Sequence, residues 1–214
     1  MKITGVIAEF NPFHNGHKYL IEKIKEKQDA VVCVMSGSFV QRGDVAVFDK
    51  WTRAEAAMHC GAALVIELPA VFATAPAERF ASGATELIEK LGCVNEITFG
   101  SECGDIDTLI NTAKILNNES DEVSQEIKHH LSSGMGYPLA LQTAFKGSVS
   151  QELLKNPNDI LAIEYIKASL KRNSKILFST MHRMEVNHSD ETTKNGYASA
   201  STVRKMIKNN ENFR

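Results

Sequence analysis

The sequence predicts an α/β fold in which a Rossmann-like parallel sheet of about five strands carries helices on both faces. Short apolar, β-branched runs alternate with longer amphipathic runs along the chain. The apolar runs are continuous, which is typical of parallel strands buried on both faces. The 214 residues, of which 43% are hydrophobic and 23% charged, suffice for one such core with an appendage. We therefore expect one domain over residues 1–214.

The first half of the chain contains four apolar runs that we interpret as strands. Amphipathic stretches follow the first three, and glycines at 61 and 92 mark two helix ends. The expected strands are Ile3–Ala8, Ala30–Met35, Ala62–Leu68 and Val94–Phe99. The expected helices are His17–Lys27, Asp49–Cys60 and Ala77–Leu91.

The stretch of about residues 105–170 changes character and predicts a helical insertion. It reads as several helices with few strand candidates: Ile106–Leu116, Glu122–Leu131, Pro138–Phe145 and Asn158–Leu170. The sheet is expected to resume at Lys175–Ser179, and a last helix is expected to start near Ser201.

Composition narrows the class of protein. The formal charge of -2 gives no global basic field that would attract nucleic acid or an anionic membrane. The four cysteines are scattered without zinc or disulfide spacing, so we interpret them as reduced thiols in a cytoplasmic protein. The amino terminus has no signal-peptide pattern, and no apolar stretch is long enough to span a membrane.

The loop Glu9–His17, EFNPFHNGH, follows the first expected strand and leads into the first helix. In a parallel sheet this is the strand-end crevice where ligands bind. Gly16 permits a close backbone approach at a helix start, where free N–H groups and the helix dipole favour phosphate. His14 and His17 can donate hydrogen bonds to phosphoryl oxygens, and nucleotidyl transfer needs such charge stabilisation. The alternative is a pair of surface histidines on a glycine turn.

A second candidate motif lies near the carboxyl end, at residues 198–204. Ser201 or Thr202 is expected to cap the last helix, and Arg204 falls within its first turn. A simple helix cap is the alternative interpretation. Paired with the histidines, a hydroxyl and an arginine can hold the β and γ phosphates of a nucleotide. We therefore expect the two ends of the chain to form one phosphate site.

These motifs resemble the two signatures of the HxGH nucleotidyltransferase superfamily, an HxGH loop after the first strand and a late Ser/Thr–Arg motif. They read HNGH at 14–17 and SASTVR at 199–204. Longer blocks resemble, in order, the bacterial tRNA(Met) cytidine acetate ligase family: VIAEFNPFHNGH, VMSGSFVQRGDVAVFDKW, LVIELP, FGSECGD, KNPNDILAIEY and YASASTVR.

The resemblance implies activation of acetate by ATP to acetyl-adenylate, then acetyl transfer to the wobble cytidine of elongator tRNA(Met). It also implies relatives with a further carboxyl-terminal region that helps to hold tRNA, so tRNA binding by this chain alone is expected to be weak. Magnesium is expected with ATP, held mainly by phosphates and water because no carboxylate cage is evident.

The residues implied to contact ATP form one continuous segment and three later positions. Gly100 and Arg183 follow expected strands and face the same crevice, whereas for Asn158 a simple helix cap is the alternative. The set is Ile7, Ala8, Glu9, Phe10, Asn11, Pro12, Phe13, His14, Asn15, Gly16, His17, Lys18, Tyr19, Leu20, Gly100, Asn158 and Arg183.

The block Ser36–Asp44 follows the second expected strand and also faces the crevice. Gln41, Arg42 and Lys50 are candidates for contact with acetate or tRNA, and a solvated loop is the alternative. Trp51 is expected to be a core or helix-packing residue rather than a base-stacking platform. Two other functions stay open: an adenylyltransferase acting on a phosphorylated small molecule, and a nucleotide- or tRNA-binding module without turnover.

Overall fold

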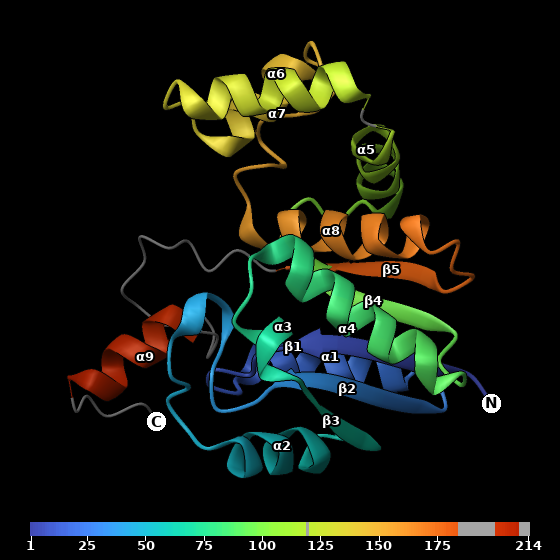
Figure 1. Cartoon of the computed structure of the whole chain (residues 1–214). Helices are drawn as coiled ribbons and strands as arrows, with labels where there is room; N and C mark the ends of the chain where they lie inside the picture. The colour runs from blue at the N-terminus through green and yellow to red at the C-terminus, as the bar shows by residue number, and fades with distance from the viewer. Residues whose placement is uncertain (119, 184–199, 210–214) are drawn as a thin grey trace.

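The computed structural model describes residues 1–118, 120–183 and 200–209 of the chain. Its centre is a five-stranded parallel sheet with the strand order β3-β2-β1-β4-β5, which runs from bottom to top in Figure 1. The strands are β1 (Ile3–Ala8), β2 (Ala30–Ser36), β3 (Leu64–Leu68), β4 (Glu96–Ser101) and β5 (Leu177–His182). The predicted Rossmann-like α/β fold is confirmed.

The order of the strands fixes where a ligand can bind. From β1 the chain moves outward to β2 and β3, and it then returns to place β4 on the other side of β1. Connections leave β1 and β4 in opposite directions, which opens a crevice beyond their carboxyl ends. The loop after Ala8 and the end of β4 at Ser101 border this crevice.

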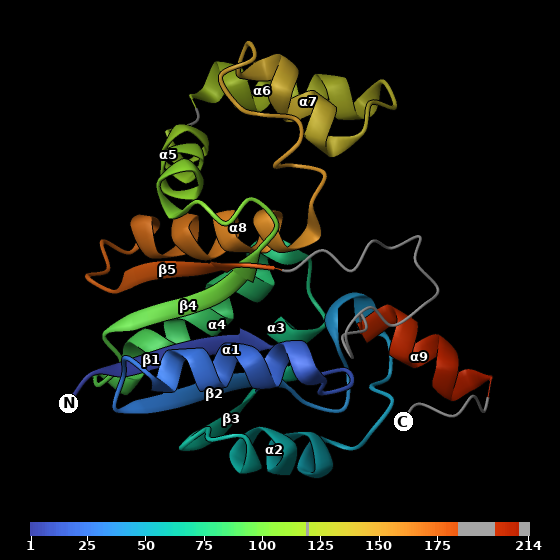
Figure 2. The same cartoon turned by 180° about the vertical axis from the view of Figure 1, so that it is seen from behind.

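Two clusters of buried residues cover the two faces of the sheet, as Figures 1 and 2 show from opposite sides. Val6, Val31 and Cys33 pack with α1 (Asn15–Lys25) and α2 (Lys50–His59) on one face. Ile7 and Val32 belong to the larger cluster on the other face. That face carries α3 (Ala70–Ala73), α4 (Ala77–Leu91) and α8 (Pro157–Lys171). Alternate residues of a strand point to opposite faces, so continuous apolar strands supply both clusters.

The chain between β4 and β5 is helical, as expected. It forms α5 (Ile106–Asn117), α6 (Asp121–Ser132), α7 (Tyr137–Ala144) and α8. In Figures 1 and 2, α6 and α7 lie farthest from the sheet, whereas α8 packs directly on it and α5 packs on α8. The predicted insertion therefore has a core-forming last helix. The limits of one domain over 1–214 stay a prediction.

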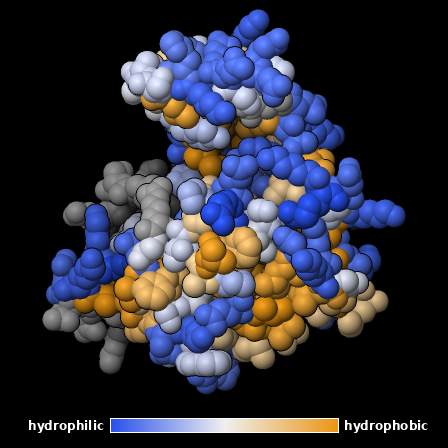
Figure 3. Space-filling model, viewed as in Figure 1, coloured by the Kyte–Doolittle hydropathy of each residue, from blue (hydrophilic) through white to orange (hydrophobic). Residues whose placement is uncertain are grey.

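The surface differs between these layers. Figure 3 shows mostly hydrophilic side chains over α6 and α7. Apolar side chains gather around α3 and in the area between α4 and β3. Val71 of α3 is 59% exposed and Leu64 of β3 is 46% exposed. Within the described residues, no helix is long and apolar enough to cross a membrane.

Several element limits differ from those that the pattern predicted. β4 begins two residues later than expected and β5 ends three residues later, at His182. The hydroxyls of Thr98 and Ser179 lie 2.7 Å apart across these strands. Ser101 and Thr180 form a second such pair at 2.6 Å, so polar residues continue a sheet whose apolar pattern has ended.

The prediction that Trp51 is a core or helix-packing residue is wrong, because its side chain is 74% exposed on α2. It follows the helix cap Asp49, whose carboxylate accepts hydrogen bonds from the backbone N–H groups of Trp51 and Thr52. The buried face of α2 starts only after Trp51, with Arg53 and Ala57.

Candidate active site

The loop that follows β1 is anchored by buried residues. Phe10 is 1% exposed and adopts a positive φ of 47°, and the peptide bond from Asn11 to Pro12 is cis. The Phe10 ring contacts the rings of Phe13 and His17 edge-on, with centroids 5.0 and 4.9 Å away. This packing presents the following histidines at the start of α1.

His14 and His17 begin α1 with a reciprocal hydrogen-bonded cap. Nδ1 of His14 accepts from the backbone N–H of Gly16 at 3.1 Å. Nδ1 of His17 accepts from the backbone N–H of His14 at 3.3 Å. The two rings stack with centroids 3.8 Å apart. Because each Nδ1 accepts, this pattern assigns the proton of each neutral ring to Nε2.

The helix α1 begins at Asn15, two residues before the expected start near His17, and His14 is its cap. Histidine is not among the residues that favour this position. The polar pattern of the sequence alone did not distinguish a capping imidazole from a loop imidazole.

Burial and charge keep both imidazoles neutral. Burial, together with the nearby Arg183 guanidinium, lowers the pKa of His14 from 6.5 to about 4. Burial also lowers the pKa of His17 well below its usual value, and His14 and Arg183 contribute to this shift. At pH 7 each ring is thus a neutral group with one N–H donor.

Arg183 reaches this site across the ends of two strands. Its backbone N–H donates to the Ser101 carbonyl at 2.9 Å, directly after β5. A Cβ at Gly100 would lie 3.0 Å from Cγ of Arg183, so the absence of a side chain at 100 lets the arginine pass over the end of β4. The structure thus brings Gly100, Arg183 and the histidine pair close together.

The carboxyl-terminal helix meets the same loop. α9 (Ala200–Lys208) lies beside the loops at the carboxyl ends of the strands in Figure 1. From its first turns, Nη1 of Arg204 donates to the carbonyl oxygen of Asn11 at 2.7 Å. This hydrogen bond joins residues 193 positions apart in the sequence. Its acceptor, Asn11, lies three residues before His14.

Ser201 and Thr202 lie inside α9, because the helix begins at Ala200. The prediction that one of them is the cap is therefore wrong. Both lie near the start of α9 as the structure describes it. Residues 198 and 199 of the predicted motif lie outside the described residues.

A cavity of about 480 Å³ opens beside Arg204. Its lining residues are Glu9, Asn11, Val40, Gln41, Asp44, Val45, Val47, Arg204 and Lys208. The carboxylate of Glu9 accepts from the Gln41 backbone N–H at 2.9 Å. Burial raises the pKa of Glu9, while this hydrogen bond and the charge of Arg204 oppose the shift. The cavity therefore has a polar wall that contains both signs of charge.

Comparison with known proteins agrees with this geometry. A family model described as HIGH Nucleotidyl Transferase matches residues 1–214. The chain belongs to the HIGH nucleotidyl transferase family.

The most similar relatives include tRNA(Met) cytidine acetate ligases. The protein of Clostridium novyi (strain NT) is 46% identical over 220 residues, covering 100% of this chain and 55% of that protein. The protein of Clostridium perfringens (strain ATCC 13124) is 44% identical over 221 residues, covering 97% and 55%. This chain thus spans about half the length of the relatives it matches.

Two solved structures of Thermotoga maritima TmcAL are similar, each 38% identical to this chain. The apo form superposes with a TM-score of 0.88, covering 99% of this chain and 52% of that chain. The form bound with alpha-thio ATP superposes with a TM-score of 0.84, covering 98% and 51%.

Asn158 of this nucleotidyl transferase is not a helix cap, because Asn156 holds the cap position of α8. Its side-chain Nδ2 instead donates to Oε1 of Glu102, just beyond β4, at 2.5 Å. The structure thus places Asn158 beside the strand end that carries Gly100.

The three acceptor-side candidates have different surroundings. Gln41 lines the cavity beside Arg204. Lys50 is not among the residues that line that cavity. Its ammonium group instead pairs with the Glu67 carboxylate at 2.6 Å and lies 5.2 Å from the centroid of the Trp51 ring. Arg42 belongs to the short turn Gln41–Gly43, and its side chain lies outside what the structure describes.

The sequence interpretation missed Arg53, which is 1% exposed inside α2. Its guanidinium donates to the carbonyl oxygens of Glu9 at 2.6 Å and of Ser36 at 3.0 Å. It also donates to the carbonyls of Phe48, at 3.0 Å, and Gly37. Arg53 therefore ties together the carboxyl ends of β1 and β2. An arginine in an amphipathic helix is normally exposed, so the pattern carried no signal of this role.

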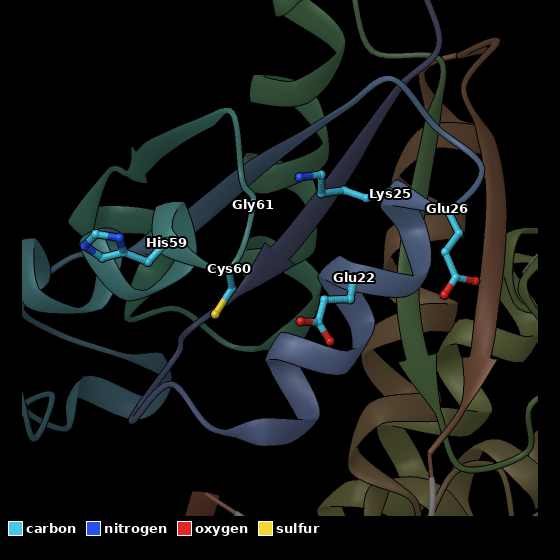
Figure 4. Close-up of a pocket in the computed structure, with 6 residues that line it drawn as sticks. All are labelled: Glu22, Lys25, Glu26, His59, Cys60 and Gly61. Carbon is cyan, nitrogen blue, oxygen red and sulfur yellow. The ribbon is translucent and has the colours of Figure 1, made fainter.

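A second depression, of about 350 Å³, lies between the carboxyl ends of α1 and α2, and Figure 4 shows its lining. Glu22 and Lys25 belong to α1 and Glu26 follows it, whereas His59 is the last residue of α2 and Cys60 and Gly61 follow it. Helix carboxyl ends lie at the opposite edge of a parallel sheet from the strand ends. This depression is thus remote from the histidine pair.

Among the described residues, no group of three or more His, Cys, Asp or Glu side chains is arranged to hold a metal ion.

Proposed function

We propose that this chain carries the catalytic site of an ATP-dependent tRNA(Met) cytidine acetate ligase. The observation that supports it most is the meeting of Arg204 with the loop that carries His14 and His17. The nucleotidyl transferase family and the named relatives supply the class of reaction. In this proposal ATP and acetate are substrates, and elongator tRNA(Met) is the acetyl acceptor.

In the first step, a carboxylate oxygen of acetate attacks the α-phosphorus of ATP. The bond from that phosphorus to the bridging oxygen breaks, pyrophosphate leaves, and acetyl-adenylate remains. The Nε2–H groups of His14 and His17, with the N-terminus of α1, stabilise negative charge on the phosphoryl oxygens. Both rings act as neutral donors, since burial lowers their pKa values and keeps them uncharged at pH 7. Arg183 and Arg204 supply the positive charge.

In the second step, the exocyclic amine of the wobble cytidine attacks the acetyl carbon. AMP leaves, the amine loses a proton, and the product is N4-acetylcytidine. The cavity beside Arg204 is the proposed acceptor side, with Gln41 as the candidate contact. Lys50 is a weaker candidate because Glu67 already pairs with it. Because the chain spans about half the length of its relatives, we expect weak tRNA binding by this chain alone.

Magnesium fits this proposal as a phosphate-bound ion. The described residues offer no cluster of three carboxylate, thiol or imidazole ligands. The donor set therefore suits an ion held by ATP phosphates and water. Magnesium bound in this way would neutralise charge on the phosphates.

The test is acetate-dependent exchange of labelled pyrophosphate into ATP, with and without elongator tRNA(Met). His14→Ala and His17→Ala are each expected to lower the exchange rate about a hundredfold or more, because each removes one N–H donor. His59→Ala is the matched control, since His59 lies at the far depression and is expected to leave exchange unchanged. ATP binding without exchange would indicate a binding module, and exchange driven only by a phosphorylated acceptor would indicate an adenylyltransferase.

A further inference from the structure

A reciprocal set of hydrogen bonds joins the segment after β4 to the start of α8. The carboxylate of Glu102 accepts from the backbone N–H of Asp159 at 3.0 Å and of Asn158 at 3.4 Å. The carboxylate of Asp159 accepts in return from the backbone N–H of Glu102 at 2.9 Å and of Cys103 at 3.2 Å. Asn156 donates to the second oxygen of Asp159 at 2.9 Å. Each carboxylate therefore holds the backbone of the other segment.

This arrangement is built into the core. Asp159 is fully buried and Glu102 is half-buried. Backbone N–H groups in the first turn of a helix lack helical partners, and negative charge is favoured there. The Glu102 carboxylate, from a different part of the chain, supplies α8 with both the hydrogen-bond acceptor and the negative charge. The distance between the end of β4 and the start of α8 is therefore set by paired side-chain bonds rather than by loop length.

The same carboxylate also fixes a side-chain amide. Nδ2 of Asn158 donates to Oε1 of Glu102 at 2.5 Å. A carboxylate accepts hydrogen bonds and cannot donate them, so the amide must turn its NH2 group toward Glu102 and its oxygen away. A half-buried acceptor of defined direction results. Glu102, which holds it, lies two residues after Gly100, the residue beside Arg183 at the strand end.

We propose that Glu102 and Asp159 are positioning residues that orient the Asn158 amide so that its oxygen accepts a hydrogen bond from the nucleoside part of ATP. This proposal rests on the proposed function, which places ATP at this strand end. The donor is an N–H or O–H group of the nucleoside, either the 6-amino group of adenine or a ribose hydroxyl. Recognition by a fixed acceptor disfavours nucleotides that lack the donor.

The first experiment measures equilibrium ATP binding and the KM and kcat of the exchange reaction for Glu102→Gln. A glutamine amide can donate or accept, so it no longer forces one orientation on Asn158. We expect about tenfold weaker ATP binding and a similar rise in KM, with little change in kcat and a melting temperature close to that of the parent. Glu102→Asp retains a carboxylate and is expected to recover part of the affinity. Glu86→Gln, which removes an exposed ion-pair carboxylate on α4, is the control.

The second experiment identifies the nucleoside donor. Binding of ATP is compared with inosine triphosphate, 2′-deoxy-ATP and 3′-deoxy-ATP, in the parent and in Asn158→Ala. One analogue is expected to bind about tenfold more weakly than ATP to the parent, and this penalty should disappear in Asn158→Ala. Inosine triphosphate reports the amino group, and the deoxy analogues report the hydroxyls. This experiment stands even if Glu102→Gln fails to fold.

Two results would overturn the proposal: unchanged ATP affinity in a folded Glu102→Gln protein, or the same analogue penalties with and without the Asn158 side chain. Equilibrium binding needs neither acetate nor turnover. Normal analogue selectivity without acetate-dependent exchange would therefore contradict the proposed function and leave this inference intact.

Discussion

At the scale of single residues, each imidazole of the pair uses its two nitrogens for different purposes. Nδ1 of His14 and of His17 accepts a backbone N–H at the start of α1. This leaves the Nε2–H as the group that can reach a ligand. The cap fixes the ring directions before any nucleotide binds, and burial fixes the protonation state. The pair is therefore preorganised for an anion.

The depressed pKa of His14 predicts a pH-dependent stability. Its pKa is about 4 in the folded protein and about 6.5 when unfolded, so between these values the unfolded chain binds more protons. Stability from the neutral ring is present above about pH 6.5 and is lost as the pH falls toward 4. The variant His14→Asn retains a capping acceptor but has no imidazole to protonate. Between pH 6.5 and 4 its free energy of unfolding should therefore fall by about 1–2 kcal/mol less than that of the parent.

Denaturant unfolding at pH 7.5, 6 and 4.5 checks this difference. His59→Asn serves as the control because His59 is largely exposed. Parallel pH curves for the parent and His14→Asn would show that burial does not depress the pKa of His14.

Residue roles were predictable from the sequence where chemistry and position agreed. His14, His17 and Arg204 carry phosphate-binding groups and stand next to expected helix starts, so they could be proposed before the structure. Glu102 and Asp159 could not, because a carboxylate that accepts backbone N–H groups of a distant segment has the same local pattern as a solvated one.

At the scale of secondary-structure elements, the loop after β1 depends on a helix that it does not join in sequence. Arg53 of α2 donates to carbonyl groups after β1 and β2, and a buried guanidinium needs such acceptors. The strand ends that flank the proposed phosphate site are thus held by a single side chain.

Replacing Arg53 by Met is expected to leave these carbonyl groups without a donor. We expect a loss of about 3 kcal/mol in the free energy of unfolding and weaker ATP binding. Arg53→Lys should recover little, because an ammonium cannot reproduce the planar fork of donors. Chemical denaturation and equilibrium binding measure both effects, and Arg79→Met is the control on an exposed arginine. Near-parental stability of Arg53→Met would refute this role.

The element types followed from periodicity, but their limits did not. The apolar run that predicts β5 ends at Ser179, whereas the strand continues to His182 by pairing with the end of β4, where Ser101 and Thr180 also form a hydroxyl pair. α1 begins early because histidines cap it. In both cases hydrogen bonds to other residues override the local pattern, and a single sequence does not record such partners.

At the scale of the whole molecule, the site depends on both ends of the described chain. The strand order places β1 at the switch point, so that the loop after it faces β4 and β5. α9 returns to that loop through Arg204 and Asn11. Truncation before α9 would therefore remove one side of the proposed triphosphate site while leaving the sheet unaffected.

A crystal structure of this protein with a non-hydrolysable ATP analogue and magnesium tests the central claim most directly. We expect Nε2 of His14 and of His17, and the Arg204 guanidinium, to lie about 2.7–3.2 Å from oxygens of one triphosphate. A nucleotide bound elsewhere, or one that contacts the imidazoles while Arg204 remains on Asn11 away from every phosphate, would contradict the account.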